Sequence, residues 1–343
     1  MNKTSAVIIL CVLGATTATV SLFTDVVTEV STDIYILPVA ELASTKTYPD
    51  VITLRNEQIE VELVPNRGRV LLGLKSLKHE VNFLHRNLIP DPMILASGLY
   101  GVEFGGYYLS LPWNNRDRQP FDLQFEIRNP DPDEAEVYLS GKDMFVRTLT
   151  ECWVRMHDDS NVVEIEVAIT NTSKRSAKEF DFRDFSLFTV DTPGRDGNMV
   201  ILPVDKTEVI RSEGGWLGEP GTEVDWRSAL QTWGRIRDYY EIQSVNELLH
   251  PCVGVYYPEL KAACIKFWEA QDFFSGVEAW AWGNSYDQVR GSGPYFGIST
   301  TASKITLEPQ QKIGFRVFFA VLDGLSSEPT AGDLYDRAKA LVK

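Results

Sequence analysis

Apolar and charged residues alternate one by one in several segments after residue 50, and this alternation constrains the fold more than any other feature. In residues 59–63, three apolar residues alternate with Glu60 and Glu62, and residues 163–169 repeat the pattern. Successive side chains of a β-strand point to opposite faces, so these segments predict strands with one buried and one polar face. By the same rule, residues 312–321 bury Ile313, Phe315, Val317 and Phe319 and expose Gly314, Arg316 and Phe318.

Turn-forming residues separate the alternating segments, as at residues 65–68 and 171–173. Many strands with one polar face predict antiparallel sheets, and therefore an all-β sandwich or barrel. Helical spacing appears only in residues 327–343, where Leu334, Ala338 and Leu341 share one face and Pro329 lies near the start. We expect one short C-terminal helix there. Residues 212–248 form a long insertion, which predicts a functional loop or short structure of its own.

The first 23 residues have one lysine, an apolar run from Ala6 to Phe23, and small residues near the end of that run. This order resembles a signal peptide, and predicts a secreted or cell-surface protein. The run is close to the ~18 residues of a membrane span, so an uncleaved anchor is an alternative. Lipidation of Cys11 and a buried first strand or helix are further alternatives. Residues 24–50 form a lead-in segment to a domain predicted over residues 51–326.

Charge and the distribution of metal-binding residues exclude several function classes. The net charge is −15 and no Lys/Arg cluster supplies a basic field, so we expect no nucleic-acid partner. The four histidines form no H-E-x-x-H pattern, no C-x-x-C pair occurs, and the acidic turns at 129–136 and 157–161 do not match an EF-hand loop. The sequence therefore predicts neither a metal nor a cofactor.

Two cysteines flank a predicted hairpin. Cys252 and Cys264 stand on either side of a turn at Pro258 and Glu259, nearly opposite each other when counted back from the turn. A cross-strand disulfide and two buried thiols are both compatible with this pattern.

The aromatic segment of residues 267–283 is the strongest candidate for a binding surface. If residues 276–282 form a strand, Glu278, Trp280 and Trp282 share one face. Indole rings pack on the C–H faces of sugars and carboxylates bind their hydroxyls, so this face predicts carbohydrate binding. The alternative is that the tryptophans belong to the core. Residues 101–113 add Glu103 and Trp113 as further candidates.

Residues 179–190 contain an unusual pattern for a strand. Phe180 and Phe182 alternate on one parity, whereas Phe185 and Leu187 alternate on the other. This change of parity predicts a β-bulge at Arg183 and Asp184, a feature that re-aims side chains and is common beside functional sites.

Three segments in order resemble the galactose-mutarotase-like superfamily, which includes aldose 1-epimerases and hexose-phosphate mutarotases. They are an opening hairpin at residues 51–76, a central strand, turn and return strand at 163–182, and a closing strand pair at 305–321. The resemblance implies a large antiparallel β-supersandwich with a sugar pocket on one concave face. It also implies that Arg183 and Asp184, on the return strand, face that pocket; a structural ion pair at the bulge is the alternative.

The catalytic residues of that superfamily have no match here. Thr172 stands where the epimerases have a histidine, and Phe185 where the hexose-phosphate branch has one. Gly297 and Ile298 occupy the segment that holds the catalytic glutamate of the family. Mutarotation needs a positioned acid and a positioned base, so the resemblance implies a protein without this activity.

The leading hypothesis is therefore an extracytoplasmic carbohydrate-binding protein that uses Arg183, Glu278, Trp280, Trp282 and Trp113 on the concave face. A second hypothesis is an epimerase, glycosidase or lyase that uses Glu103, Asp184 or Glu278 as catalytic acids. A third is a structural or assembly protein of the cell surface.

Overall fold

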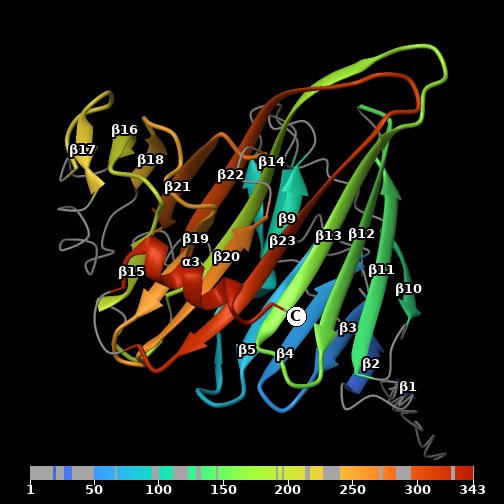
Figure 1. Cartoon of the computed structure of the whole chain (residues 1–343), viewed down its shortest axis with the longest axis horizontal. Coiled ribbons are helices and arrows are strands. Elements are labelled where there is room, and N and C mark those ends of the chain that lie inside the picture. Colours follow the sequence, from blue (N-terminus) through green and yellow to red (C-terminus); the bar gives the residue numbers. More distant parts are fainter. Residues whose placement is uncertain are drawn as a thin grey trace, which may run out of the picture.

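The computed structural model of the chain describes residues 18–20, 27–32, 50–65, 68–94, 100–110, 123–128, 133–143, 146–190, 192–194, 197–212, 217–226, 240–269, 273–282, 295–325 and 329–342. Within these residues, two large antiparallel β-sheets pack face to face, as the alternation predicts (Figure 1). The all-β fold class is confirmed.

The larger sheet has thirteen strands in the described part of the chain. Its order is β1 (Ala18–Val20), β2 (Val27–Thr32), β3 (Asp50–Arg55), β4 (Ile59–Val64), β5 (Arg69–Ser76), β9 (Tyr107–Ser110), β14 (Lys178–Thr189), β22 (Tyr295–Leu307), β21 (Gly276–Trp282), β18 (Tyr240–Ser244), β16 (Lys206–Ser212) and β17 (Glu223–Asp225), and β6 (Val81–Asn82) pairs with β5. The predicted insertion at 212–248 thus has short structure of its own, because it supplies β17 and β18.

The smaller sheet has eight strands in the described residues. Its order is β10 (Gln124–Arg128), β11 (Glu134–Lys142), β12 (Thr148–His157), β13 (Val162–Asn171), β23 (Lys312–Asp323), β20 (Ala262–Trp268), β19 (Cys252–Tyr257) and β15 (Met199–Ile201). A separate strand pair is formed by β7 (Arg86–Ile94) and β8 (Tyr100–Gly105).

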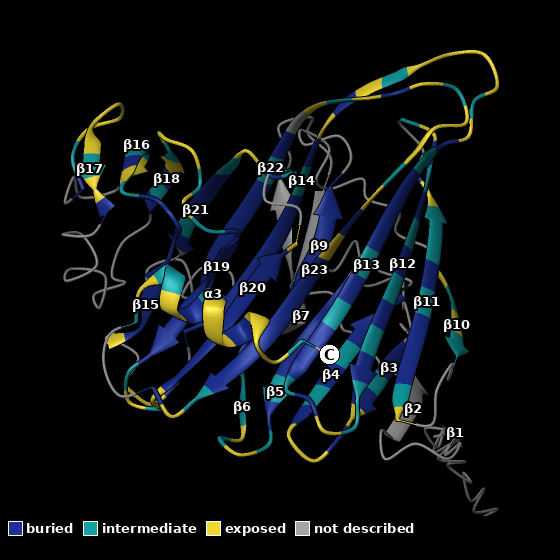
Figure 2. Ribbon diagram, viewed as in Figure 1, coloured by how far each residue is buried: buried dark blue, intermediate teal, exposed yellow. Residues whose placement is uncertain are grey.

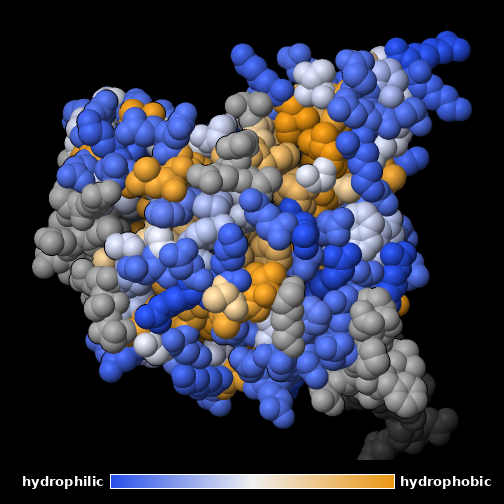
Figure 3. Space-filling view, in the orientation of Figure 1, coloured by the Kyte–Doolittle hydropathy of each residue, from blue (hydrophilic) through white to orange (hydrophobic). Residues whose placement is uncertain are grey.

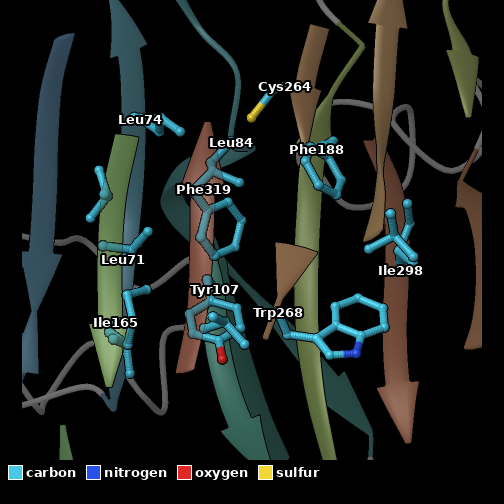
Figure 4. Packing of buried hydrophobic residues seen from close by; sticks show 14 of the residues in the cluster. Leu71, Leu74, Leu84, Tyr107, Ile165, Phe188, Cys264, Trp268, Ile298 and Phe319 are labelled. Carbon is cyan, nitrogen blue, oxygen red and sulfur yellow. The ribbon is translucent and has the colours of Figure 1, made fainter. Parts of the chain in front are cut away.

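The hydrophobic core lies between the two sheets. The apolar residues predicted to face inward on β4, Ile59, Val61 and Leu63, are all buried there. Figure 4 shows side chains of both sheets meeting in this core, among them Tyr107 of β9 and Phe319 of β23, whose ring centroids lie 5.0 Å apart. Figure 2 shows the central strands as almost continuously buried, whereas turns and sheet edges are exposed.

The predicted C-terminal helix is α3 (Ala331–Lys339), which lies across the outer face of the smaller sheet (Figure 1). Thr330 caps its first turn, and its hydroxyl accepts a hydrogen bond from the Asp333 amide, a capping arrangement typical of helix starts. Leu334 and Ala338 are buried in a second apolar cluster, whereas Leu341 lies beyond the helix end and is exposed. Figure 3 shows mostly hydrophilic side chains on this side of the molecule, with hydrophobic ones between them.

Phe318 corrects one prediction. Alternation places it on the exposed face of β23, but it is buried in the same apolar cluster as Leu334 and stacks on Phe267 at 4.9 Å. The helix covers this part of the outer face, so both faces of β23 are buried there. The alternation rule assumes one exposed face and therefore does not predict the burial of Phe318.

The N-terminal strands lie at one edge of the larger sheet. β1 and β2 fall within the segments predicted as a signal peptide and a lead-in, so the sheet extends beyond the predicted boundary at residue 51. The remaining residues before Asp50 lie outside the described ranges, and the signal peptide and the anchor stay predictions. Among the described residues, no helix combines the length and hydropathy of a membrane span.

The predicted cysteine hairpin is present as β19 and β20, but its two cysteines are not opposite each other. Cys252 pairs in register with Phe267, and Cys264 pairs with Val255. Their side chains point to opposite faces of the sheet, and both are buried free thiols. Burial raises the pKa of Cys252 to about 12, which makes the thiol unreactive.

Candidate functional site

Strand β14 runs through the centre of the larger sheet and is buried on both faces. Its register with β22 is continuous across Arg183 and Asp184, so the predicted bulge at these residues is wrong. The register shift lies between Phe180 and Phe182 instead. The apparent change of parity arises because both faces of the strand are buried from Asp184 onward, so Phe185 and Leu187 pack on the face opposite to Phe182.

Asp184 faces the smaller sheet and closes a buried polar cluster. Lys266 of β20 donates to Asp184 Oδ1 at 2.6 Å, Thr300 Oγ1 donates to the same oxygen at 2.5 Å, and the Tyr107 hydroxyl donates to Oδ2 at 3.2 Å. Both charged side chains are fully buried, and burial lowers the pKa of Lys266 although Asp184 opposes the shift. The carboxylate therefore ties the sheets together, and the prediction that it faces a pocket beside Arg183 is wrong.

An aromatic cluster covers the opposite side of β14, which we call the outer face because it is turned away from the smaller sheet. It contains Tyr108, Phe185, Leu187 and Tyr295, with Trp280 packed against them. Phe185 stacks on Tyr108 at 4.9 Å and meets the Trp280 ring edge-on at 5.7 Å. Four neighbouring strands, β9, β14, β22 and β21, supply these rings.

Trp280 lies flat over Gly297, its register partner on β22. A β-carbon at Gly297 would lie 2.0 Å from the indole ring, so any side chain there requires the tryptophan to move. The two positions where the family resemblance places catalytic groups, Phe185 and Gly297, thus meet on this face beneath one indole. Neither residue has a side chain that can donate or accept a proton, and Phe185 is fully buried.

One ion pair borders the aromatic cluster. The Arg183 guanidinium donates a hydrogen bond to the Glu278 carboxylate, and both side chains are mostly buried. The pair neutralises its own charges, so this border offers hydrogen-bonding groups without a net field.

Two buried polar atoms at this face have no hydrogen-bond partner among the described residues. They are His85 Nε2 and Ser299 Oγ. The His85 ring packs on Tyr295 at 4.8 Å, and Ser299 lies between Phe185 and Glu278 in the register. Unsatisfied buried groups are costly and need an explanation. Both atoms are as buried as similar atoms inside the core, such as Ser186 Oγ, and differ from them in lying beside the aromatic cluster.

Burial lowers the pKa of His85 from 6.5 to about 4, so the imidazole is neutral at pH 7. A neutral imidazole offers one donor and one acceptor, and a serine hydroxyl offers both. Beside aromatic rings, these groups are typical of sites that bind sugar rings through C–H faces and hydroxyls. Sequence reasoning missed His85, Ser299 and Tyr295, because isolated residues gave no pattern until the strands aligned them.

The structure brings some of the predicted site residues together, whereas the side chains of others lie outside its described part. Arg183, Glu278 and Trp280 come together on the outer face. Trp282 and Glu103 belong to β21 and β8, but their side chains lie outside the described part of the structure, as does Trp113. Among the described residues, no group of three or more His, Cys, Asp or Glu side chains is placed to hold a metal ion.

Similarity to known proteins is found in structure and not in sequence. No family model and no curated protein sequence matches the chain. A TPR-domain containing protein from Parabacteroides distasonis ATCC 8503 aligns with a TM-score of 0.68 and 14% identity, covering 90% of this chain. The chain spans only 58% of the length of that protein.

Two further structures match over nearly their whole length. A proposed aldose 1-epimerase from Klebsiella pneumoniae aligns with a TM-score of 0.62 and 11% identity, over 96% of this chain and 92% of that one. A proposed mutarotase (YeaD) from Salmonella typhimurium aligns with a TM-score of 0.58 and 13% identity, over 90% of this chain and 97% of that one. The chain has the galactose-mutarotase-like fold, as the resemblance implied.

Proposed function

We propose that the outer face of the larger sheet binds carbohydrate. The observation that carries the proposal is the composition of this face: the partly exposed Trp280 ring packs on the buried Phe185 and lies on the same face as the Arg183–Glu278 pair. An apolar ligand would make no hydrogen bond with the charged pair, and a purely polar ligand would not cover the indole ring. A sugar satisfies both, and the fold shared with proposed mutarotases and epimerases supports the same class of ligand.

The proposal is one of binding without mutarotation. Phe185 and Gly297 supply no acid or base, Asp184 is committed to Lys266, and Glu278 to Arg183. His85 is neutral at pH 7 and buried, and a single such group does not make the acid–base pair that ring opening needs. Secretion to the cell surface, which the first 23 residues predict, belongs to the same proposal and accords with a glycan as ligand.

Substitution of Trp280 tests the binding proposal. We expect Trp280→Ala to weaken saccharide binding by ~1–3 kcal/mol, because an indole face contributes strongly to such contacts. Trp153→Ala is the matched control, since Trp153 is also a partly buried tryptophan but lies on the outer face of the smaller sheet beside Tyr138. A glycan array first identifies the saccharides that the wild type binds. Calorimetric titration with these saccharides then compares the affinities of the wild type and both variants.

Equal losses in both variants, or a wild type that retains no saccharide, would contradict the proposal. Thermal melts of both variants show whether either loss reflects unfolding. With the same preparations, polarimetry of freshly dissolved galactose and glucose should show the spontaneous rate only. Protein-dependent equilibration that survives repurification would favour an epimerase in place of a binding protein.

A further inference from the structure

A lysine and an aspartate from the two sheets meet in the core without access to solvent. Lys266 Nζ lies 2.6 Å from Asp184 Oδ1, and neither side chain has any exposed surface. Aromatic rings surround the amine: Nζ lies 5.4 Å from the ring centroid of Phe274, 5.7 Å from that of Trp268 and 5.8 Å from that of Tyr107. Removing two charges from water costs much of what their attraction gains. A neutral product of the same two groups would avoid this cost.

The Thr300 hydroxyl bridges the amine and the carboxylate. It accepts a hydrogen bond from Lys266 Nζ at 2.8 Å and donates one to Asp184 Oδ1 at 2.5 Å. The hydroxyl can therefore take a proton from the amine while it passes its own proton to the carboxyl oxygen. Transfer of an acyl group to an amine needs both events, because the nucleophile must lose a proton and the leaving oxygen must gain one.

Tyr107 supplies a hydrogen bond to the other carboxyl oxygen, and its hydroxyl donates to Asp184 Oδ2 at 3.2 Å. Burial raises the pKa of Tyr107 well above its ordinary value, so the hydroxyl stays protonated and remains a donor. When an amine attacks a carboxyl carbon, negative charge develops on the oxygen that is retained, and a donor aimed at that oxygen stabilises it. Burial also lowers the pKa of Lys266, which favours the neutral and nucleophilic form of the amine.

We propose that Lys266 and Asp184 form an intramolecular isopeptide bond that links the two sheets covalently. Lys266 Nζ bonds to Asp184 Cγ, and the bond between Cγ and Oδ1 breaks. The ammonium group loses two protons, and both leave with Oδ1 as one water molecule, with the Thr300 hydroxyl as the relay. Oδ2 becomes the carbonyl oxygen of the amide and keeps its hydrogen bond from Tyr107. The balance needs no oxidant, reductant or further reactant.

Proximity and the dry surroundings favour the amide over the ion pair. Reacting groups that one structure holds in the correct orientation behave as if present at ~10⁵–10⁸ M. The water that is released leaves a site with no exposed surface, and the amide carries no buried charge. The bond joins residues that are 82 positions apart in sequence, so it also restricts the unfolded chain, as a disulfide does. The cysteines of the described residues are free thiols and provide no such link.

Peptide mapping of the wild-type protein by mass spectrometry tests the proposal directly. A tryptic digest should contain one branched peptide that includes both Lys266 and Asp184, lighter than the sum of its two linear parts by the mass of one water molecule. Trypsin does not cleave after an acylated lysine, so peptides that end at Lys266 should be missing. Lys312 is the internal control, because it pairs with Glu151 at 3.3 Å but is half exposed, and linear peptides that end at Lys312 should be recovered.

Substitution of Thr300 tests the proposed relay. Cell-free synthesis of the chain allows formation of the branched peptide to be timed. We expect Thr300→Val to slow it by about 10²-fold or more, because a positioned acid–base group contributes ~10²–10⁴ to a rate, whereas Thr300→Ser keeps the hydroxyl and should restore the rate. Thr301→Val is the matched control, since Thr301 is the next residue on β22, pairs in register with Arg183 and points to the other face of the sheet.

Linear wild-type peptides that end at Lys266, with no branched peptide, would overturn the proposal and leave the two residues as an ion pair. A mass loss of one water molecule without a branched peptide would also overturn it, because that loss then comes from cyclisation of another residue. Equal rates of cross-linking in wild type and Thr300→Val would overturn the relay mechanism. None of these outcomes depends on carbohydrate binding, because the site lies between the sheets and the proposed binding surface lies on the outer face.

Discussion

His85 is the residue whose environment departs furthest from what its sequence position suggested. In sequence His85 is one of four histidines outside any H-E-x-x-H pattern, but in the structure its ring is buried against Tyr295 and its Nε2 has no partner among the described residues. A titratable group in this position responds to pH in a defined direction. Its folded-state pKa of about 4 lies below the ordinary 6.5, so the unfolded chain binds more protons between these values.

We therefore expect the His85 contribution to stability to be fully present above about pH 6.5 and to be lost as the pH falls towards 4. A shift of this size corresponds to about 3 kcal/mol at most. Urea unfolding of wild type and His85→Gln at pH 7 and pH 4.5 measures it as a difference between the two proteins. The difference in free energy of unfolding between wild type and His85→Gln should change between the two pH values, with the wild type losing more stability than the variant at pH 4.5. Parallel profiles of wild type and His85→Gln would contradict this assignment.

Among the elements, β14 shows where alternation works and where it stops. Strands with one solvent face, such as β4 and β13, were predicted residue by residue. The sequence of β14 was misinterpreted because two buried faces produce no alternation, and because a charged residue, Asp184, is in the core. Its partner Lys266 is 82 residues away in sequence, and no local sequence pattern indicates that the two residues pair. The bulge predicted from sequence would turn both Arg183 and Asp184 toward one pocket. In the structure the two side chains point to opposite faces of the sheet.

The buried ion pair between Asp184 of β14 and Lys266 of β20 leads to a prediction about stability. Lys266→Met should destabilise the protein by about 3–5 kcal/mol, because it leaves the Asp184 carboxylate buried without its counter-charge. Lys312→Met is the control: Lys312 pairs with Glu151 at 3.3 Å but is half exposed, and such pairs contribute about 0–1 kcal/mol. Denaturant unfolding curves give both values.

The double variant Asp184→Leu/Lys266→Met separates charge burial from packing. We expect it to recover much of the loss of Lys266→Met, since it removes both charges at once. The loss of unfolding free energy in the double variant is compared with the summed losses of Lys266→Met and Asp184→Leu. If the loss in the double variant is the larger one, the pair contributes more than a simple balance of charges and the interpretation fails.

At the scale of the whole molecule, the fold was predictable and the site only partly so. Strand order and packing follow from many alternating segments, which is why two sheets and the terminal helix could be anticipated, and the same fold persists at 11–14% identity. The site combines side chains from β9, β14, β22 and β21. These side chains are up to 191 residues apart in sequence, from Tyr108 to Ser299, and meet only because the strands pair. Sequence identified Trp280, Glu278 and Arg183 because they stand in dense local patterns. It could not identify Ser299, a single serine made significant by its neighbours across the sheet.

Indole resonances provide the most direct test of carbohydrate binding at the outer face. In a ¹⁵N–¹H spectrum, the Trp280 side-chain signal, assigned with Trp280→Phe, should shift progressively as an array-selected saccharide is added. The Trp268 signal should stay in place, because that indole is buried between the sheets. A saccharide that binds but shifts only Trp153, on the other sheet, or that leaves the Trp280 signal unmoved at saturation, would contradict the account.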